Sequence, residues 1–509
     1  MKKMFCLIGF ALWGMMAPAR PIAYLDDGEF HAIRGQVEQS LSTFHLDEAA
    51  TRVRGLNQKA YEAFYLLNID VYKYLSTQHS RYRDQLMARW DEGLDQIELL
   101  PETDSLKEVM VADLYCKRSI IAFLDESYFQ AVRYARSGRK MILKSANKWG
   151  DFPDQMKLRG LFNVLLGAIP SKYQWITQTL GYEGDVQLGM EQLTEASTRS
   201  KLLRMEASLV SCFVEKNMLN RTQQALERLV KARQQGPNIL LDFILASGYM
   251  SIKQNQQALD ILNRREQYQQ GGVFFIPYWD YLLGKAYYYQ GHHRNAQIYF
   301  SRFLKGYKGK LFRSDAYFRL AMSLTLDGSY AQGKGIFTLI SSDEFEGLDE
   351  DAYARAMAEK FAQNPPNAFQ LNLFQARNLF DGGYLSQAVE ILDEVRAKKA
   401  KLSQDEICEM HYRYGRVYHS QGKLTMAREN YQASQAFGTE EVTWMKASAA
   451  YYQGEIARQL GQWSIAEKEY KRALAYDDYF YQAGIENRCK AALGELKHQR
   501  KNQASSSKR

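Results

Sequence analysis

The chain has 509 residues, of which 46% are hydrophobic and 13% aromatic, and its formal net charge is +8. The charge is mild for this length, and basic residues are interspersed with acidic ones, so we do not expect nucleic-acid binding. The prolines beyond the first 19 residues stand between periodic segments. A proline inside a helix costs about 3 kcal/mol, so this placement favours an all-helical chain.

Residues 1–19 resemble a signal peptide. Lys2 and Lys3 precede an apolar stretch, Met4–Ala17, and Ala17-Pro18-Ala19 is a small-x-small cleavage site. The apolar stretch is shorter than the roughly 20 residues that span a bilayer, although an uncleaved anchor is the alternative. We therefore expect an exported protein, periplasmic or outer-membrane-associated in a Gram-negative bacterium. Removal of the two lysines would lower the formal charge from +8 to +6.

Residues 20–235 are predicted to form an N-terminal helical domain with degenerate hairpins. Phe44–Leu56 is typical of the second helix of a hairpin, with Ala49 at its small position. Two further pairs, 12 residues apart, are Ser119/Ala131 and Phe213/Ala225. Long helices are predicted over Gln58–Leu75 and over Ser80–Leu99, which ends before Pro101.

The segment Gly160–Leu193 departs from this pattern. Pro170 breaks a helix, Trp175 begins a new apolar face, and Gly181 with Gly184 marks a loop.

Residues 236–492 contain a motif that occurs six times, in which a small residue is followed 12 positions later by alanine or glycine. The pairs are Ala246/Ala258, Gly284/Ala296, Ala321/Gly333, Ala376/Ala388, Gly415/Ala427 and Gly454/Ala466. A large residue lies four positions after the second member: Leu262, Phe300, Phe337, Leu392, Tyr431 and Tyr470. Small residues allow two helix backbones to approach, and large ones fill the adjacent holes. Since one hairpin cannot bury such a face alone, the copies must stack.

Five of the six copies have a glycine seven positions after the first small residue: Gly291, Gly328, Gly383, Gly422 and Gly461. Glycine there ends the first helix in a left-handed conformation at little cost. The second members of successive pairs are separated by 38, 37, 55, 39 and 39 residues, which we interpret as longer helices and loops.

Two polar segments flank the last copies. The acidic segment Ser341–Asp351 is predicted to be a solvated loop, because its ligand alternation and glycine position do not fit a calcium-binding EF-hand. Residues 493–509 are predicted to be a basic disordered tail.

The six copies resemble the tetratricopeptide repeat (TPR), whose signature is a small residue at position 8, an aromatic at 11 and alanine at 20. Leu282–Phe300 is the best match. The resemblance implies an all-α, TPR-like α-solenoid of stacked antiparallel helix hairpins, irregular in the N-terminal half.

The Gly160–Leu193 segment is similar to the hallmark of the tetratricopeptide-repeat-39 and yeast inclusion-body-clearance (mitochondrial outer-membrane) family. The matching residues are Gly160, Phe162, Asn163, Ile169-Pro170, Leu180-Gly181-Tyr182, Gly184-Asp185 and Gly189. Val186 stands where the family usually has arginine. The resemblance implies a solenoid without enzymatic activity, used in lipid- or inclusion-related housekeeping.

No motif for catalysis is found, so we expect no enzyme, no catalytic residue and no cofactor. His292-His293 lacks a third ligand nearby in sequence, so no metal site is expected. The cysteines Cys116, Cys212, Cys408 and Cys489 are predicted to be separate buried thiols.

A concave groove is the predicted binding site, since the first helix of each stacked hairpin lines it. The residues predicted to form it are Tyr281, Lys285, Tyr288, Phe318, Arg377, Tyr412, Arg416, His419, Tyr451 and Arg458. Aromatic rings beside cations suit an extended protein or peptide ligand. Tyrosines of this kind also serve packing alone. No copy has the position-9 asparagine of the dicarboxylate clamp, so capture of an acidic C-terminal tail is not expected. The sequence thus predicts an exported scaffold, used in envelope assembly. The alternative is a membrane-associated protein that handles lipids or lipid-linked components.

Overall fold

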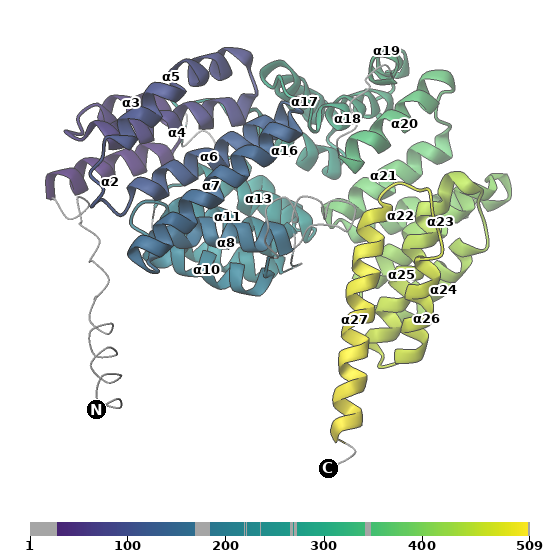
Figure 1. The fold of residues 1–509 in the computed structure, drawn as a ribbon. Helices are drawn as coiled ribbons and strands as arrows, with labels where there is room; N and C mark the ends of the chain where they lie inside the picture. The colour runs from purple at the N-terminus through teal and green to yellow at the C-terminus, as the bar shows by residue number, and fades with distance from the viewer. Residues whose placement is uncertain are drawn as a thin grey trace. The chain divides into compact units, whose positions relative to one another are not determined.

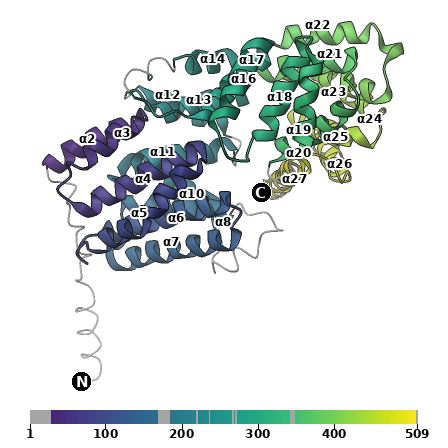
Figure 2. The ribbon, with the colours of Figure 1, turned by 90° about the horizontal axis from the view of Figure 1, so that it is seen from above.

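The computed structural model describes residues 28–167, 184–341 and 348–506, apart from residues 218, 220, 235, 265–267 and 269–271. Every regular element in these residues is a helix (Figures 1 and 2). The expected all-α fold is therefore confirmed. The expected signal peptide lies outside the described residues.

Contacts divide the chain into two units. The first comprises Met1–Gly248 and Asp260–Ile276, and the second comprises Tyr249–Leu259 and Pro277–Arg509. The division falls within helices α13 (Ile239–Ser251) and α14 (Asn255–Leu262), downstream of the boundary expected after residue 235.

The first unit contains helices in consecutive antiparallel pairs. They are α2 (Gly28–Ser42), α3 (Leu46–Val53), α4 (Lys59–Thr77), α5 (Ser80–Glu98), α6 (Lys107–Leu124), α7 (Tyr128–Trp149), α8 (Pro153–Gly167), α10 (Val186–Arg199), α11 (Arg204–Asn217) and α12 (Thr222–Arg233). The two long helices predicted before Pro101 correspond to α4 and α5.

The second unit stacks the regular repeats. Its helices are α16 (Pro277–Gln290), α17 (His293–Gly306), α18 (Arg313–Leu326), α19 (Tyr330–Ser341), α20 (Asp349–Gln363), α21 (Ala368–Gly382), α22 (Leu385–Arg396), α23 (Gln404–Ser420), α24 (Leu424–Gln435), α25 (Thr443–Gln459), α26 (Trp463–Ala473) and α27 (Gln482–Ser506). The 55-residue spacing contains an additional helix, α20, so our interpretation of it as longer helices and loops was wrong.

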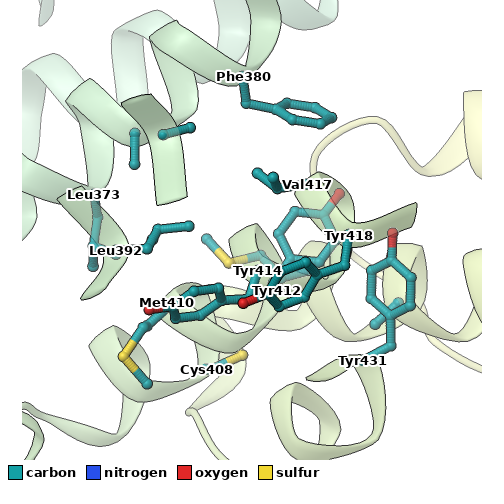
Figure 3. Packing of buried hydrophobic residues seen from close by; sticks show 14 of the residues in the cluster. Leu373, Phe380, Leu392, Cys408, Met410, Tyr412, Tyr414, Val417, Tyr418 and Tyr431 are labelled. Carbon is teal, nitrogen blue, oxygen red and sulfur yellow. The ribbon is translucent and has the colours of Figure 1, made fainter. Parts of the chain in front are cut away.

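Three hairpin seams in the second unit place a ring against a glycine, as the repeat pattern predicts. A Cβ added to Gly284, Gly415 or Gly454 would lie 2.6–2.8 Å from ring carbons of Phe300, Tyr431 and Tyr470, respectively. The paired alanines are fully buried. Figure 3 shows the resulting core of α21–α25, in which aliphatic side chains surround Tyr412, Tyr414 and Tyr431. Stacking of buried seams therefore holds this unit together.

The turns share one backbone geometry in both units. The five predicted glycines have φ between 70° and 88°, and Phe44, Glu126 and Lys253 occupy the same turn position with φ of 60–62°. The residue after each donates its N–H to the carbonyl oxygen five residues earlier, at 2.8–2.9 Å in eight hairpins. This bond satisfies a helix-end carbonyl. Two degenerate copies, at Ala49 and at Ser119/Ala131, are thereby identified as hairpins of the same kind.

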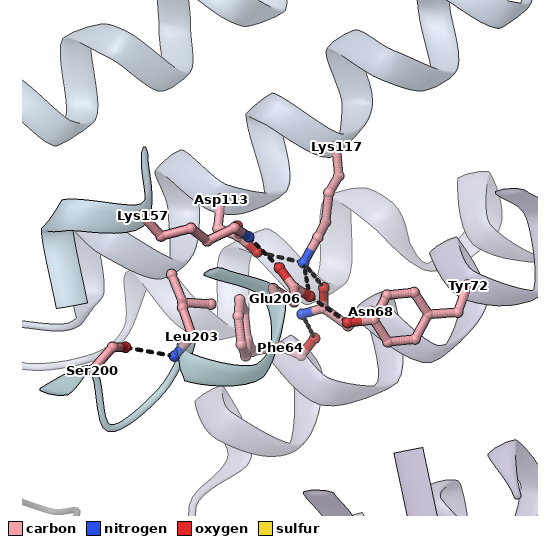
Figure 4. A network of polar contacts seen from close by, with 9 residues as sticks. All are labelled: Phe64, Asn68, Tyr72, Asp113, Lys117, Lys157, Ser200, Leu203 and Glu206. Atoms are coloured by element: carbon pink, nitrogen blue, oxygen red, sulfur yellow. Dashed lines mark hydrogen bonds and ion pairs between the residues drawn. The ribbon is translucent and has the colours of Figure 1, made fainter. Parts of the chain in front are cut away.

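The interior of the first unit contains a charged network (Figure 4). Lys117 Nζ lies 2.6 Å from Asp113 Oδ2 and 2.7 Å from Glu206 Oε1, and Lys157 Nζ lies 2.5 Å from Asp113 Oδ1 and also contacts Glu206. Burial alone lowers the pKa of Lys157, but Asp113 and Glu206 more than offset this, so its pKa is above the ordinary value. Two cations and two anions from α6, α8 and α11 thus neutralise one another.

Helices α8 and α10 cross at backbone contact. A Cβ on Gly160 would lie 2.7 Å from the Gly189 carbonyl oxygen, and one on Gly189 would lie 2.8 Å from the Gly160 carbonyl oxygen. Asn163 donates to Gln192 across the same crossing at 2.8 Å. Residues matched to the family hallmark therefore hold this helix pair, while the hallmark residues 169–182 lie outside the described part.

Two polar segments differ from expectation. Asp351, expected in a solvated loop, is fully buried in the first turn of α20, where it accepts the N–H groups of Phe312 at 2.8 Å and Asp315 at 3.0 Å. These bonds cap α18, which explains its burial. Residues 342–347 of that segment lie outside the described residues. Helix α27 continues to Ser506, so most of the expected disordered tail is helical, as its lack of proline allows.

Candidate peptide-binding site

Helices α16, α18, α20 and α21 of the second unit surround a cavity of about 210 Å³. Four predicted groove residues line it: Lys285, Tyr288, Phe318 and Arg377. The first helices of three repeats thus converge as expected. The additional helix α20, which the repeat pattern did not show, supplies Tyr353.

Cations in this cavity lie against aromatic faces. Lys285 Nζ is 5.3 Å from the Tyr281 ring centroid, and Arg319 Cζ is 5.5 Å from that of Tyr288. Asp315 accepts hydrogen bonds from Arg319 Nε and the Tyr281 hydroxyl, both at 2.7 Å. Arg319 therefore already has a carboxylate partner.

Arg377 lies in a cavity that a segment of the C-terminal part also lines. Its guanidinium donates to the Tyr353 hydroxyl at 3.0 Å and lies 3.8 Å from Asp381. Tyr481, with φ of 67°, lines the same cavity, and its ring centroid is 5.9 Å from that of Tyr353. The residues before α27 thus close one side of the cavity.

A second group of basic side chains surrounds the ring of Phe380, near the end of α21. Arg416 Cζ is 4.8 Å from the Phe380 centroid and 4.5 Å from that of Tyr452. Lys253 Nζ, from the α13–α14 turn, is 4.7 Å from the Phe380 centroid. The His419 ring lies 5.9 Å from the Tyr452 ring. We call Lys253 and Arg416 the cation cluster, and the His419 ring lies beside it.

No carboxylate of the described residues forms an ion pair with the cation cluster, although Asp381 acts to raise the pKa of Lys253 and Glu455 acts to raise that of His419. Arg416 donates one hydrogen bond, to the Tyr412 hydroxyl at 3.0 Å, and neither it nor Lys253 forms an ion pair with a residue that the structure describes. Burial lowers the pKa of Lys253, and the Arg416 charge lowers it further. Burial and the same charge also lower the pKa of His419. An anion bound here would relieve this repulsion.

Four of the predicted aromatic residues lie beneath the groove surface. Tyr281, Tyr288, Phe318 and Tyr412 have only 2–4% of their surface exposed, because their rings fill the helix seams. They hold the cations in place and present little area to a ligand. Ligand contact by the half-buried Lys285, Arg377, Arg416 and His419 stays a prediction.

The last two predicted residues are not part of either group. Arg458 is paired with Glu455 at 2.9 Å, and Tyr451 packs on Tyr470 with centroids 6.0 Å apart. Both lie in the final hairpin.

Sequence reasoning placed Phe380 on the groove but missed Lys253 and Tyr452. Lys253 occupies the turn position at which the other five copies have glycine. The sequence did offer a signal for Lys253: a lysine stands at a turn position where the left-handed backbone favours glycine, and such strained positions often have a function.

A larger cavity of about 670 Å³, between α20, α21, α23 and α25, is lined by carboxylates and apolar side chains. Three of its carboxylates have partners: Glu441 pairs with Lys360 at 2.5 Å, Glu409 pairs with Arg413 at 2.6 Å, and Glu406 accepts the Ser403 N–H at 2.7 Å. These three charges are therefore already compensated within the chain.

The described residues show no group of three or more metal-ligating side chains. The four cysteines are buried thiols without a disulfide, as expected, and burial raises the pKa of Cys408 to about 11. No helix in the described ranges is both long and apolar enough to cross a bilayer.

No protein-family model matches the chain, and no curated protein matches it. The likeness to the tetratricopeptide-repeat-39 family therefore remains a resemblance of the Gly160–Leu193 segment. Among solved structures, the chain is similar to the APC/C hetero-tetramer Cut9–Hcn1, with 14% identity, a TM-score of 0.30, and coverage of 91% of this chain and 90% of that one. It is also similar to a Rap protein complexed with competence and sporulation factor, with 13% identity, a TM-score of 0.30, and coverage of 91% and 99%. These scores are too low to carry an argument about function.

Proposed function

We propose that the protein is a non-enzymatic scaffold that binds a protein or peptide on the first helices of its second unit. The observation that carries the proposal is the cation cluster: Arg416 and Lys253 are half-buried and contact one ring, and neither forms an ion pair with a described carboxylate. A partly desolvated cation is costly unless an anion is supplied, and charge-assisted hydrogen bonds to a carboxylate are strong. The bound segment therefore supplies a carboxylate, from a side chain or a C terminus.

The experiment is selection of a displayed random-peptide library on the wild-type protein, followed by affinity measurement on purified variants. Selected peptides should share an acidic side chain or a free C terminus, which amidated and Gln-substituted versions distinguish. Arg416→Gln should lower their affinity about tenfold or more, since a charged hydrogen bond contributes about 1.5–3 kcal/mol. The matched control, Lys423→Gln, changes an exposed cation outside the cluster and should leave affinity unchanged.

Selected peptides without any acidic preference would contradict the role of the cluster while leaving a scaffold in place. A chain that selects no peptides would contradict the scaffold itself.

We also propose that the protein is exported and acts in envelope assembly, on the evidence of the leader sequence 1–19. Cell fractionation tests the location. Pull-down from crosslinked envelopes, compared between wild type and Tyr412→Ala/Arg416→Glu, tests for defined protein partners. Lipid that co-purifies with the protein in place of protein partners would favour the lipid-handling alternative.

A further inference from the structure

Helix α7, in the first unit, has a cluster of basic residues on its outward face, although the sequence predicted that basic residues are interspersed with acidic ones. The helix has six basic residues and no acidic one: Arg133, Arg136, Arg139, Lys140, Lys144 and Lys148. Its inner face packs on α6 and α8 through small and apolar residues such as Ala131, Gly138 and Ile142. Figure 2 shows α7 at the margin of its unit. The expectation that basic residues are not collected on one face is wrong for this helix.

Residues on the outward face follow helical spacing and are exposed. Phe129, Arg133, Arg136 and Lys140 are separated by three or four positions, so they lie on one side of the helix. Lys144 and Lys148 have acidic neighbours, since they lie 3.3 and 3.5 Å from Glu108. Arg133, Arg136 and Lys140 form no ion pair with a residue that the structure describes. Three cations are thus available to a partner.

Three exposed aromatic side chains flank the α6–α7 turn: Phe123 at the end of α6, and Tyr128 and Phe129 at the start of α7. Phe129 is 85% exposed, Phe123 57% and Tyr128 51%, and the last two rings stack edge-on with centroids 5.5 Å apart. Large apolar side chains gathered at this degree of exposure indicate an interaction surface. We call these three rings the aromatic tip.

We propose that α7 docks on an anionic membrane surface. Each cation attracts acidic lipid headgroups and adds to the binding free energy, and salt weakens this attraction. The aromatic tip enters the interface between headgroups and acyl chains, where amphipathic and aromatic side chains are stabilised. A bilayer is a better partner than an acidic protein or a nucleic acid, because this face combines basic side chains along the helix with exposed aromatic side chains at one end. A bilayer offers both anionic headgroups and an apolar interior. This proposal is independent of the peptide site, which lies in the other unit.

The test is co-sedimentation of the full chain with vesicles of phosphatidylcholine alone and with vesicles that also contain phosphatidylglycerol. Wild type should bind the anionic vesicles more strongly, and added salt should weaken this binding. Arg136→Glu/Lys140→Glu should lower the anionic-vesicle partition at least about tenfold. Phe123→Ser/Phe129→Ser should lower it several-fold with the salt dependence retained. Because the apolar leader is common to every variant, it does not affect the differences between them.

Matched controls change similar residues on the other unit: Lys308→Glu for charge and Ile298→Ser for an exposed apolar side chain. Both should bind as wild type, and thermal melts should show all variants folded. Equal binding to neutral and anionic vesicles, or unchanged binding after the double charge reversal, would overturn the proposal. So would a duplex DNA fragment whose binding depends on Arg136 and Lys140 while vesicle binding does not.

Discussion

In the second unit a ring closes three hairpin seams against a glycine, whereas in the first unit charged side chains from three helices meet in the interior. The ring–glycine seams repeat the same local contact, so each copy is stabilised largely by its own hairpin and its neighbours. The network of Asp113, Lys117, Lys157 and Glu206 has no such locality, because every member depends on partners distant in sequence. Regular stacking therefore distributes stability along the chain, whereas the buried network makes the first unit depend on a few side chains.

The largest effect is expected from Lys157→Met. The substitution leaves two buried carboxylates with one cation, and breaking a buried pair costs about 3–5 kcal/mol. Chemical denaturation followed by circular dichroism measures the loss of unfolding free energy. Lys157→Met/Asp113→Asn should recover part of the loss, because it leaves Lys117 and Glu206 balanced. The exposed ion pair of Lys471 and Glu467, 2.7 Å apart on α26, offers the control: Lys471→Met should cost no more than about 0.5 kcal/mol. A similar small loss for Lys157→Met would remove the contrast between the units.

Asp351 is one of the buried carboxyl groups of the second unit, and burial raises its pKa from 3.8 to about 6. Between these values the folded protein holds a proton that the unfolded chain has released. The contribution of Asp351 to stability is therefore fully present below the lower value and is lost as pH rises through the upper one. Relative to Asp351→Asn, wild type should lose about 2–3 kcal/mol between about pH 4 and pH 7. Denaturation of both proteins across this range measures the difference. A constant difference would show that the carboxyl does not titrate within the fold.

Gly415→Ala tests the ring seam directly. The added Cβ would lie 2.6 Å from the Tyr431 ring, and overpacking of a seam costs about 1–3 kcal/mol. Tyr431→Leu in the same chain should relieve the clash, so the double variant should be more stable than the sum of the two single losses predicts. Gly335→Ala is the matched control: nothing lies within 4 Å of its added Cβ, so it should stabilise α19 slightly. Equal effects of the two alanine substitutions would contradict the seam.

The smallest effect concerns the turn geometry that both units share. Glu126 has φ of 60° at the position that glycine occupies elsewhere, so Glu126→Gly should raise stability by up to about 1 kcal/mol. Gly328→Ala, at φ of 88°, should lower it by a similar amount. Thermal melts compare the two. Shifts of the same sign would indicate that the turns of the two units are not equivalent.

The regular repeats could be predicted because their contacts are local. The spacing of Gly415, Ala427 and Tyr431 reflects one hairpin, and the glycine turn reflects one backbone bond. Helix α20 was hidden, because an additional helix only lengthens the interval between copies. The buried network was also hidden: Asp113 and Lys117 are one helical turn apart, but nothing local links them to Glu206.

The site shows the same limit. Arg416 and His419 follow from their positions on a first helix, and the structure brings them together. Lys253 joins them because the α13–α14 turn lies against the end of α21, where the Lys253 carbonyl oxygen would be 2.0 Å from a Cβ on Gly383. A contact between residues this far apart in sequence produces no periodic pattern from which it could be predicted. The sequence assigned four buried rings to the groove surface, because repeat position alone does not distinguish a residue that lines the groove from one that fills a seam between helices.

The crossing of α8 and α10 restricts how this chain can change over evolutionary time. At the ring seams, a bulkier first residue can be accommodated by a trimmed partner, so pairs of substitutions offer a route for drift. At Gly160 and Gly189 each missing methyl would meet the other residue's carbonyl oxygen, and no exchange of amino acid removes a carbonyl oxygen. No second substitution can therefore compensate for a side chain at either position. Only separation of the two helices, with loss of the Asn163–Gln192 hydrogen bond, would make room for one.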